Sequence, residues 1–566
     1  MNTINILIGG EAGQGLVSTG NILLQAIAQK GWFLYATQDY ESRIRGGHNF
    51  FQIRVSQEPV STMKNEVDIL VSLDKVTYDR HKDLLAQDAV VIFDPEFSTV
   101  EGESRANVGI PFGKVATDNN QPRVMANAVA AGAIWGLLSD DFELLASVLA
   151  NVFASKGAEI IAGNHLVAQK GFEIAKGLVG SELKLAQPSN PEPRMLLKGN
   201  DALPLGALAS GLQFMSAYPM TPSTGVTEFV ATHSNRLSVV MEQAEDEISA
   251  INMAIGASYT GVRAMTATSG GGFALMTEAL SLAGAAEIPI VVINAQRPGP
   301  STGLPTRTEQ GDLLFAFGTS TGDFPKAIFA PGDVEDAFYL MCHAFNIADK
   351  YQMPVIVLSD QHLADSYQTI EPLDLEKVKI ERGLIVSGDK DYKRYAFTET
   401  GISPRQFPNF GEGLVVSAGD EHDEYGHLTE DATIRKKMME KRMAKMILVQ
   451  EEALDPLVVG DDDPEIVLIG WGSTKGALLE AAELFRAEGK TCQIVHLTQV
   501  YPLSKKLEDI LNGKGSKYVV ESNYTGHLEK LLAMEFGWKP TGHVRRYDGR
   551  PISPSFIVEK LQGRDA

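Results

Sequence analysis

Cysteine is scarce in this chain of 566 residues, which has only Cys342 and Cys492. Two isolated cysteines can build neither a disulfide framework, nor a CxxC pair, nor the four-cysteine set that holds an iron–sulfur cluster. Long apolar runs are lacking as well. The most apolar helical stretch, 124–138, is rich in Ala and Gly and is interrupted by Asn127. No segment reaches the roughly 18–20 apolar residues that span a bilayer, so a transmembrane protein is not expected.

Basic residues are in deficit, with 50 Lys and Arg against 72 Asp and Glu and a formal net charge of −22. A field of this sign repels phosphate backbones and anionic lipid, which disfavours binding of nucleic acid or a membrane surface as the main task. The N-terminus leads directly into the apolar segment Ile4–Ile8. A signal peptide would need a basic start and a longer apolar stretch, so we expect a cytoplasmic protein.

The composition, 44% hydrophobic and 22% charged, is that of a globular protein, and at roughly 150 residues per domain the length predicts three to four domains. The pattern of helix, strand and proline divides the chain into an N-terminal α/β domain, a Pro-rich linker, a strictly alternating α/β domain, an irregular connecting region and a final α/β domain. We place these parts at residues 1–182, 183–196, 197–372, 373–455 and 456–566.

The strands expected in the third part, such as Ile288–Asn294 and Val355–Leu358, are continuous apolar runs rather than alternating ones. Such strands are typical of a parallel sheet covered by helices on both faces. We therefore predict a doubly wound α/β domain whose ligands bind at the carboxyl ends of the strands.

A glycine-rich segment, Gly9–Gly15, follows the first expected strand and opens a helix. The backbone N–H groups of Gly13, Gln14 and Gly15 are therefore candidates to hold a phosphate. The spacing is not that of the dinucleotide-binding fingerprint, and the glycines equally suit a tight turn with close helix packing. A second candidate anion site lies just before the expected strand Phe50–Val55 and consists of Arg43, Arg45, Gly46 and Gly47.

The segment Tyr218–Ser223 (Tyr-Pro-Met-Thr-Pro-Ser) lies where a parallel strand is expected to end. Its simplest role is to start a helix, with Thr221 as N-cap and Pro222 in the first turn. The same position would also let a hydroxyl and free N–H groups meet a substrate oxyanion.

Glu247 opens the next helix, and acids at a helix N-terminus are explained by the helix dipole alone. The dipole does not explain the small residues that follow, Ala250, Ala254 and Gly256. A Glu that opens this pattern resembles the pyrimidine-side domain of thiamine diphosphate enzymes. In that domain the carboxylate hydrogen-bonds N1′ of the cofactor and small residues allow close packing.

Arg297 follows a further strand, in a Pro-rich turn. A guanidinium there would form a bidentate contact with a substrate carboxylate, worth on the order of 1.5–3 kcal/mol. Taken alone, Arg297 is more simply interpreted as a surface arginine before a Pro-rich turn.

Together these segments resemble the α part of 2-oxoacid:ferredoxin oxidoreductases. The resemblance implies that Thr221 contacts the substrate, Glu247 activates thiamine and Arg297 holds the 2-oxoacid carboxylate, with Tyr218 and Pro219 beside the cofactor. The order of the parts and the stretches 296–312 and 426–431 most resemble 2-oxoglutarate:ferredoxin oxidoreductase α subunits. The N-terminal domain resembles the family's γ domain, to which Gly13–Gly15 and Arg45–Gly47 would contribute coenzyme A contacts. The last domain resembles the transketolase C-terminal domain.

The same resemblance implies what a partner supplies. No Gly-Asp-Gly motif is present to hold the Mg²⁺ of thiamine diphosphate, and two cysteines cannot hold a [4Fe–4S] cluster. We expect both in a β subunit that shares the thiamine diphosphate, with ferredoxin as electron acceptor and an (αβ)₂ assembly. The chain alone would then be inactive, and the expected reaction is the reversible conversion of 2-oxoglutarate and coenzyme A to succinyl-CoA and CO₂.

Several alternatives remain open at this stage. The substrate could be pyruvate or a branched-chain or aryl 2-oxoacid, or the chain could be a non-catalytic subunit that binds coenzyme A or a nucleotide. Arg307, His422 and His427 are candidates for a distal substrate carboxylate, and the cluster 421–427 is a weaker candidate for a metal site. The basic helix expected at 434–445 is interpreted as a solvated face with an apolar underside, or less simply as a ferredoxin-docking surface.

Overall fold

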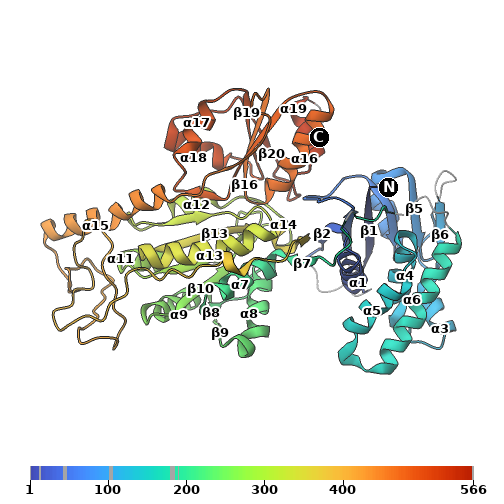
Figure 1. Ribbon diagram of the computed structural model, residues 1–566, viewed down its shortest axis with the longest axis horizontal. Helices are drawn as coiled ribbons and strands as arrows, with labels where there is room; N and C mark the ends of the chain where they lie inside the picture. The colour runs from blue at the N-terminus through green and yellow to red at the C-terminus, as the bar shows by residue number, and fades with distance from the viewer. Residues whose placement is uncertain are drawn as a thin grey trace. The chain divides into compact units, whose positions relative to one another are not determined.

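The computed structural model describes residues 2–11, 15–42, 47–100, 106–178, 185–188 and 190–563 (Figure 1). It divides into two compact units, one of residues 1–198 with 365–373 and one of residues 199–364 with 374–566. Both units combine sheets with covering helices, so the predicted α/β fold class is confirmed. Among the described helices, none combines the length and the apolar character needed to cross a bilayer.

The first unit is built on a mixed sheet with the strand order β6-β5-β4-β1-β3-β2-β14-β7. The strands β1, β4, β5 and β6 run parallel, and the others join in antiparallel fashion. The bounds are β1 Thr3–Glu11, β2 Phe33–Asp39, β3 His48–Ser56, β4 Val67–Ser72, β5 Leu85–Phe93, β6 Ala106–Gly109, β7 Met195–Lys198 and β14 Tyr367–Ile370. β7 takes up the last residues of the predicted linker.

The helices of this unit are α1 Leu16–Gln29, α2 Lys75–His81, α3 Phe112–Asp118, α4 Ala126–Leu138, α5 Phe142–Val152 and α6 Ala158–Leu178. The Ala- and Gly-rich α4 is almost entirely buried and packs closely along α6. A Cβ at Gly136 would lie only 2.8 Å from the carbonyl oxygen of Phe172, so this helix pair needs glycine at the crossing. The rings of Trp32 and Trp135 meet edge to face at 5.8 Å in the core.

The second unit contains a sheet with the order β18-β12-β13-β11-β10-β8-β9, in which only the edge strand β18 is antiparallel. Every residue of β11 and β13 is buried, as expected for a sheet covered on both faces. The bounds are β8 Leu212–Ala217, β9 Val240–Gln243, β10 Arg263–Thr268, β11 Ile290–Gln296, β12 Ala327–Phe329, β13 Pro354–Asp360 and β18 Gln499–Tyr501.

The helices of this layer are α7 Gly199–Ala209, α8 Thr224–Leu237, α9 Glu247–Tyr259, α10 Gly270–Leu275, α11 Thr277–Ala285, α12 Leu313–Gly318, α13 Val334–Tyr351 and α14 Gln361–Asp365. The helix-forming stretch 270–285 is divided at Met276, which is both the C-cap of α10 and the N-cap of α11.

A third sheet, with the order β15-β17-β16-β19-β20, forms the C-terminal part of the second unit (Figure 1). Its elements are β15 Leu457–Gly460, β16 Ile466–Trp471, β17 Cys492–Leu497, β19 Ser516–Glu521, β20 Gly542–Arg545, α16 Lys475–Ala487, α17 Lys506–Asn512, α18 His527–Phe536 and α19 Pro554–Leu561. One hydrophobic cluster runs from α9 and α10 into β16, β19 and α18, so the two sheets of this unit share a core.

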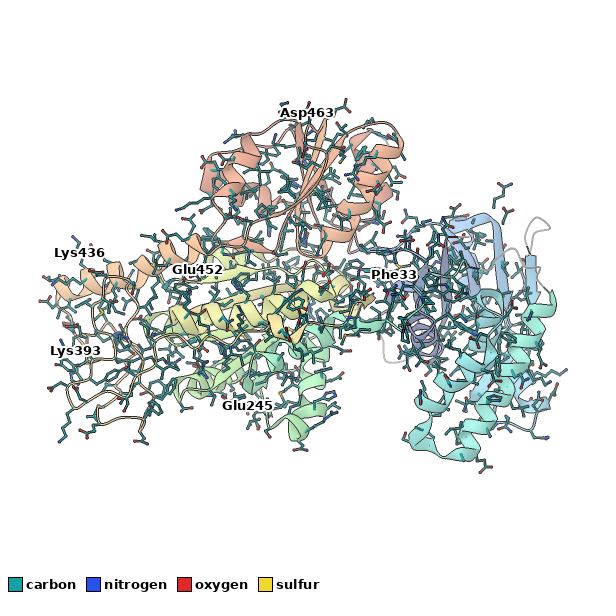
Figure 2. The ribbon with its side chains drawn as sticks, viewed as in Figure 1. Phe33, Glu245, Lys393, Lys436, Glu452 and Asp463 are labelled. Carbon is teal, nitrogen blue, oxygen red and sulfur yellow. The ribbon has the colours of Figure 1, made fainter. Side chains whose placement is uncertain are left out.

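The connecting region, 374–431, is fully described and holds only a short 3₁₀ turn, Leu375–Lys377, and two isolated bridges, followed by the long helix α15 Ala432–Glu451. Figure 2 shows its side chains, with Lys393 on the irregular segment and Lys436 on α15. Arg405 donates to the carbonyl oxygen of Ser258 and Arg382 to that of Gly261 (2.7 Å). The irregular segment is thus fastened to α9 and the turn after it by buried or half-buried arginines.

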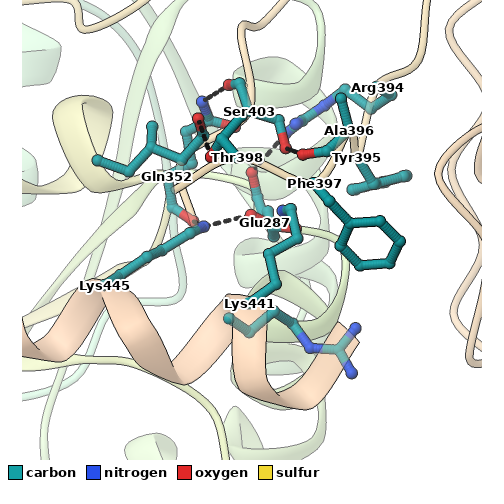
Figure 3. A network of polar contacts seen from close by, with 12 residues as sticks. Glu287, Gln352, Arg394, Tyr395, Ala396, Phe397, Thr398, Ser403, Lys441 and Lys445 are labelled. Carbon is teal, nitrogen blue, oxygen red and sulfur yellow. Dashed lines mark hydrogen bonds and ion pairs between the residues drawn. The ribbon is translucent and has the colours of Figure 1, made fainter. Parts of the chain in front are cut away.

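The expectation of a solvated basic face on α15 holds only for its first half, where Arg435, Lys436 and Lys437 are exposed. Lys441 and Lys445 are buried, and both pair with the fully buried Glu287, which follows α11 (Figure 3). Arg394 donates to the Glu287 carbonyl oxygen at 2.7 Å. Burial alone would raise the pKa of the Glu287 carboxyl, but the two ammonium groups hold it well below its usual range. Lys441 and Lys445, in the second half of α15, therefore face the residue after α11 rather than solvent, and removal of Glu287 would leave them buried without a counter-charge.

Candidate active site

The predicted site lies at the carboxyl edge of the seven-stranded sheet. The parallel strands β8, β9, β10 and β11 all end there, and three of them, β8, β9 and β11, are followed by a segment that the sequence singled out. Tyr218–Ser223 follows β8, Glu247 follows β9, the turn before α10 follows β10 and Arg297 follows β11. This is the edge at which open α/β sheets bind their ligands.

Glu247 is the first residue of α9 and is held there by local contacts. The preceding Asp246 caps the helix by accepting from the Ser249 N–H at 2.7 Å. Ser216 on β8 donates to the Ala250 carbonyl oxygen at 2.6 Å, which ties the first turn of α9 to the sheet. The glutamate itself is only 4% exposed. Its position is therefore fixed by the backbone around it rather than by its own carboxylate.

The Glu247 carboxylate lies in a cradle formed by a glycine. A Cβ at Gly272 would come within 2.6 Å of Glu247 Oε1, so only glycine leaves room for this rotamer. Within the described residues, the buried Oε1 has no hydrogen-bond partner. A buried acceptor without a partner is costly and is rare unless a ligand satisfies it. The donor that it lacks matches a ring nitrogen of a protonated aminopyrimidine, so the residues present fit thiamine diphosphate.

The small residues after Glu247 divide into two groups. Ala250 and Ala254 are fully buried, as expected for close packing of α9. Gly256 is exposed, and a Cβ there would meet nothing within 4 Å in the described structure. The expectation that Gly256 shares the packing side is therefore wrong.

Arg297 and Thr221 come together across the edge. Arg297 Nη1 donates to the Thr221 carbonyl oxygen at 2.7 Å. Burial lowers the pKa of the Arg297 guanidinium, and Asp312 opposes this shift. The guanidinium keeps its other N–H groups for further acceptors, in the fork geometry that suits a carboxylate.

Thr221 does not cap the helix that follows it. The N-cap of α8 is Ser223, whose hydroxyl donates to the Met220 carbonyl oxygen at 2.7 Å instead of capping. Asn200 donates to the Pro222 carbonyl oxygen at 2.9 Å, and this hydrogen bond holds the turn between β8 and α8. The interpretation of Thr221 as N-cap is therefore wrong, and its hydroxyl is not needed for the helix. Tyr218 and Pro219 are exposed at the same turn.

Two acidic residues of the stretch that follows Arg297, Asp312 and Glu309, were not among the site residues predicted from the sequence. Asn294 donates to Asp312 Oδ2 at 3.1 Å, and the Asp312 N–H donates to Gln296 Oε1 at 2.9 Å. Burial raises the pKa of Asp312, whereas Asn294 and Arg297 lower it. Burial and the neighbouring Asp312 raise the pKa of Glu309 to about 7. Their position in the stretch 296–312, which follows Arg297, is the sequence feature that could have identified them as site residues.

The three candidates for binding a distal carboxylate of the substrate, Arg307, His422 and His427, lie in different surroundings. Arg307 is half-buried in the stretch 296–312, whereas His427 is exposed on the connecting region. His422 is fully buried, its Nδ1 lies 3.0 Å from the Asp420 carbonyl oxygen, and its ring packs 4.0 Å from that of Tyr395. It belongs to the core of the connecting region. Among the described residues, no group of three or more His, Cys, Asp or Glu side chains is placed to hold a metal ion.

In the first unit, the structure brings Gly15 and Gly47 to one edge. Gly15, with φ 78°, precedes α1 beyond the end of β1, and Gly47, with φ 80°, precedes β3. Because Glu11 pairs with His48, both glycines lie at the same end of the sheet. The other predicted residues of this site lie outside the described residues: Gly13, Gln14, Arg43, Arg45 and Gly46. A cavity of about 320 Å³ lies beside the Asn127 side chain, which packs on Gly15.

Comparison with known proteins agrees with this site. A family model described as "Pyruvate flavodoxin/ferredoxin oxidoreductase, thiamine diP-bdg" matches residues 205–441, and one described as "Pyruvate ferredoxin/flavodoxin oxidoreductase" matches residues 5–174. The first match includes the whole carboxyl edge described above. The fold and the site thus define a subunit of a thiamine-dependent oxidoreductase.

The full-length relatives narrow this class. The 2-oxoacid:ferredoxin oxidoreductase subunit alpha of a Sulfolobus species is 36% identical, over 98% of this chain and 96% of its own. The 2-oxoglutarate synthase subunit KorA of Methanothermobacter thermautotrophicus is 32% identical, over 64% of this chain and 97% of its own. The structure of 2-oxoglutarate:ferredoxin oxidoreductase from Magnetococcus marinus is 33% identical, with a TM-score of 0.93 over 100% of this chain and 99% of the other. The chain belongs to the α subunits of the 2-oxoacid:ferredoxin oxidoreductase family, as its motifs predicted.

Proposed function

We propose that this chain is the α subunit of a 2-oxoglutarate:ferredoxin oxidoreductase, which converts 2-oxoglutarate and coenzyme A to succinyl-CoA and CO₂ and reduces ferredoxin, reversibly. The observation that carries the proposal is the buried Oε1 of Glu247 beside Gly272, which has no hydrogen-bond partner among the residues that the structure describes. It lies at the edge where Arg297 donates to Thr221. The choice of substrate is supported by the Magnetococcus marinus structure, which holds 2-oxoglutarate, coenzyme A and succinyl-CoA and matches this chain from end to end.

Each side chain has a role that follows from its position. Thiamine diphosphate, when bound, supplies the nucleophilic carbon and the electron sink for decarboxylation. Glu247 accepts a hydrogen bond from the pyrimidine ring and holds a proton at that nitrogen. Arg297 pairs with the 1-carboxylate of the 2-oxoacid, and the Thr221 hydroxyl donates to its carbonyl or carboxylate oxygen. Tyr218 and Pro219 line the turn at the cofactor.

The second half of the site comes from a partner in this proposal. Exposed apolar side chains occur on β9, α9 and α10, the elements that carry the site: Val240, Ile248, Met253 and Leu275. Exposed apolar side chains on the elements that carry a site support a protein contact there. We infer that a β subunit covers them and brings the diphosphate-binding domain, its Mg²⁺ and a [4Fe–4S] cluster, in an (αβ)₂ assembly that passes electrons to ferredoxin. Cys342 and Cys492 are both buried, and they lie in different sheet layers.

Coenzyme A contacts are proposed for the first unit. Gly15 and Gly47, at one end of its sheet, would join Gly13, Gln14, Arg45 and Gly46 to hold phosphate groups through backbone N–H groups and one guanidinium. The parts at 1–182, 197–372 and 456–566 then act as the γ, thiamine-binding and transketolase-C-like domains.

Replacement of Glu247 by Gln tests the proposal against a non-catalytic subunit. The chain is purified with its β subunit, and 2-oxoglutarate- and coenzyme A-dependent viologen reduction is measured. Glu247→Gln should abolish turnover while the complex still assembles, because an amide cannot hold the pyrimidine proton. Glu245→Gln is the matched control, since Glu245 is exposed two residues earlier (Figure 2). Unchanged turnover in Glu247→Gln would leave only the non-catalytic role. If the wild-type complex turned over pyruvate faster than 2-oxoglutarate, the assignment of 2-oxoglutarate as the substrate would be refuted.

A further inference from the structure

A cavity of about 550 Å³ opens in the C-terminal part of the second unit, away from the site described above. It lies where the parallel strands β19 and β20 end (Figure 1). The residues of the cavity that matter here are Tyr524, Lys530, His543, Arg545, Tyr547 and Lys560. The carboxyl ends of parallel strands are the usual ligand position in α/β sheets, and the volume is that of a small-molecule site.

The charge of this cavity is opposite to that of the protein as a whole. Lys530, Arg545 and Lys560 line it, and none of the described residues that line it is acidic. One nearby carboxylate, Glu529, pairs with Arg545 at 2.5 Å and lies 3.5 Å from His543 Nδ1. This offsets one of the three permanent positive charges. Two lysines are left at the cavity of a chain whose net charge is −22, so the cavity favours anions locally.

Two tyrosines at the mouth supply aromatic surface. Tyr524 is 67% exposed and Tyr547 is 56% exposed, and their rings meet edge to face at 5.0 Å. The loop between β19 and α18, which carries Tyr524, is held by the buried Asn523. The Asn523 side chain accepts from the Gly526 N–H at 2.7 Å and donates to Glu521 Oε2 at 2.7 Å. Exposed rings on a fixed loop are suited to stack on a planar base at small entropic cost.

The loop that carries Tyr547 also contacts the thiamine-binding layer. The Thr308 N–H donates to the Gly549 carbonyl oxygen at 3.3 Å, and a Cβ at Gly549 would lie 3.0 Å from Cβ of Arg307. Thr308 and Arg307 belong to the stretch 296–312 that follows Arg297. A ligand in the cavity would therefore touch a loop that is directly coupled to the stretch bearing the substrate-binding arginine.

We propose that this cavity binds a nucleoside diphosphate group, with the phosphates on Lys530 and Lys560 and the base against Tyr524 and Tyr547. Two molecules offer this chemistry, a free nucleotide such as ADP and the 3′-phospho-ADP end of coenzyme A. The second source rests on the proposed function, whereas the first does not. With a free nucleotide, the contact between the Tyr547 loop and the stretch 296–312 makes the cavity a regulatory site.

The test is calorimetric titration of ADP, coenzyme A, pantetheine and pyrophosphate into the full chain and into its complex with the β subunit. ADP should bind at one molecule per chain. The pairs Tyr524→Ala with Tyr547→Ala, and Lys530→Gln with Lys560→Gln, should each weaken ADP binding at least about tenfold. These four side chains are exposed, and circular dichroism checks the fold. The control is Lys514→Gln, because Lys514 is equally exposed but precedes β19 at the opposite end of the sheet.

The outcomes separate the sources. Coenzyme A that binds at least about tenfold more tightly than ADP, and whose binding both pairs of substitutions weaken, identifies coenzyme A as the occupant of the cavity. Coenzyme A binding that both pairs leave unchanged belongs to the first unit, and the cavity then takes a free nucleotide. Pyrophosphate that binds as tightly as ADP would overturn the base contact and the proposal with it. The proposal would also be overturned if neither ADP nor coenzyme A bound, or if both pairs of substitutions left ADP binding unchanged. Loss of ADP binding in the complex, because the β subunit blocks the cavity, would overturn it as well. Binding is measured without turnover, so failure of the proposed reaction would not affect the result.

Discussion

Replacement of Gly272 by Ala is expected to disable the site while the fold survives. A Cβ at this position would lie 2.6 Å from Glu247 Oε1 and 2.7 Å from its Cγ, and the Thr268 hydroxyl is closer still. Ordinary contacts begin at 3.4 Å, so the carboxylate must move by roughly 0.8 Å. A displacement of about 1 Å in a catalytic group costs about 100-fold in rate, and this is the loss expected in kcat.

The stability of the variant should change less than its activity. An alanine inside α10 gains up to about 1 kcal/mol in helix propensity, and overpacking against Glu247 costs about 1–3 kcal/mol. The expected net effect is a loss of up to about 2 kcal/mol, measured by thermal unfolding of the full chain. Turnover is measured in the complex with the β subunit, by viologen reduction with 2-oxoglutarate.

The matched control is Gly256→Ala in α9. Nothing in the described structure lies within 4 Å of a Cβ there, so the same substitution should leave turnover within twofold and stabilise the helix slightly. If Gly272→Ala keeps more than half of the wild-type turnover, the glycine cradle does not position Glu247. If both variants lose activity equally, the loss reflects a changed subunit contact instead.

Two further predictions concern buried charge. Glu287→Gln should destabilise the chain by about 3–5 kcal/mol, because it leaves the buried Lys441 and Lys445 uncompensated, whereas Glu440→Gln, on the exposed side of α15, should change the free energy of unfolding by less than about 0.5 kcal/mol. Equal unfolding temperatures for the two variants would contradict this. The KM for the 2-oxoacid should rise as the pH passes about 7, because Glu309 is neutral below its pKa and becomes a second negative charge above it. Glu309→Gln should flatten this dependence, and a wild-type KM that does not rise with pH would exclude Glu309 from the site.

The positions of the candidate site residues could be predicted because parallel sheets follow a simple rule. Each of Thr221, Glu247 and Arg297 follows a parallel strand, and the carboxyl ends of such strands meet at one edge. The sequence therefore places them together without any knowledge of side-chain contacts. The cradle at Gly272 could not be predicted in this way, because it depends on the rotamer of Glu247 and on the turn between β10 and α10.

The misassigned N-cap at Thr221 is a local error of two residues, since Ser223 is the N-cap of α8. The error at the second half of α15 has a different cause, which is contact between residues distant in sequence. Nothing nearby in the sequence shows that Glu287, 154 positions before Lys441, pairs with the buried Lys441 and Lys445. The strand β14 joins a sheet formed mainly by the first 110 residues, after the chain has completed most of the thiamine-binding layer. Composition and periodicity report local preferences, and tertiary packing overrides them at these places.

The unpaired atoms at the carboxyl edge argue that the folded chain is prepared for its ligands before they arrive. A buried acceptor left without a donor costs about 1–3 kcal/mol, and Glu247 Oε1 and Asn294 Oδ1 both lie unpaired at this edge within the described residues. A subunit that acted only as a scaffold would have no reason to retain this cost, since shorter apolar side chains would fill the same space. The surrounding helix cap, the glycine cradle and the Arg297–Thr221 contact all hold these atoms in place rather than pair them. We expect this cost to be offset when the proposed cofactor and substrate supply the missing partners.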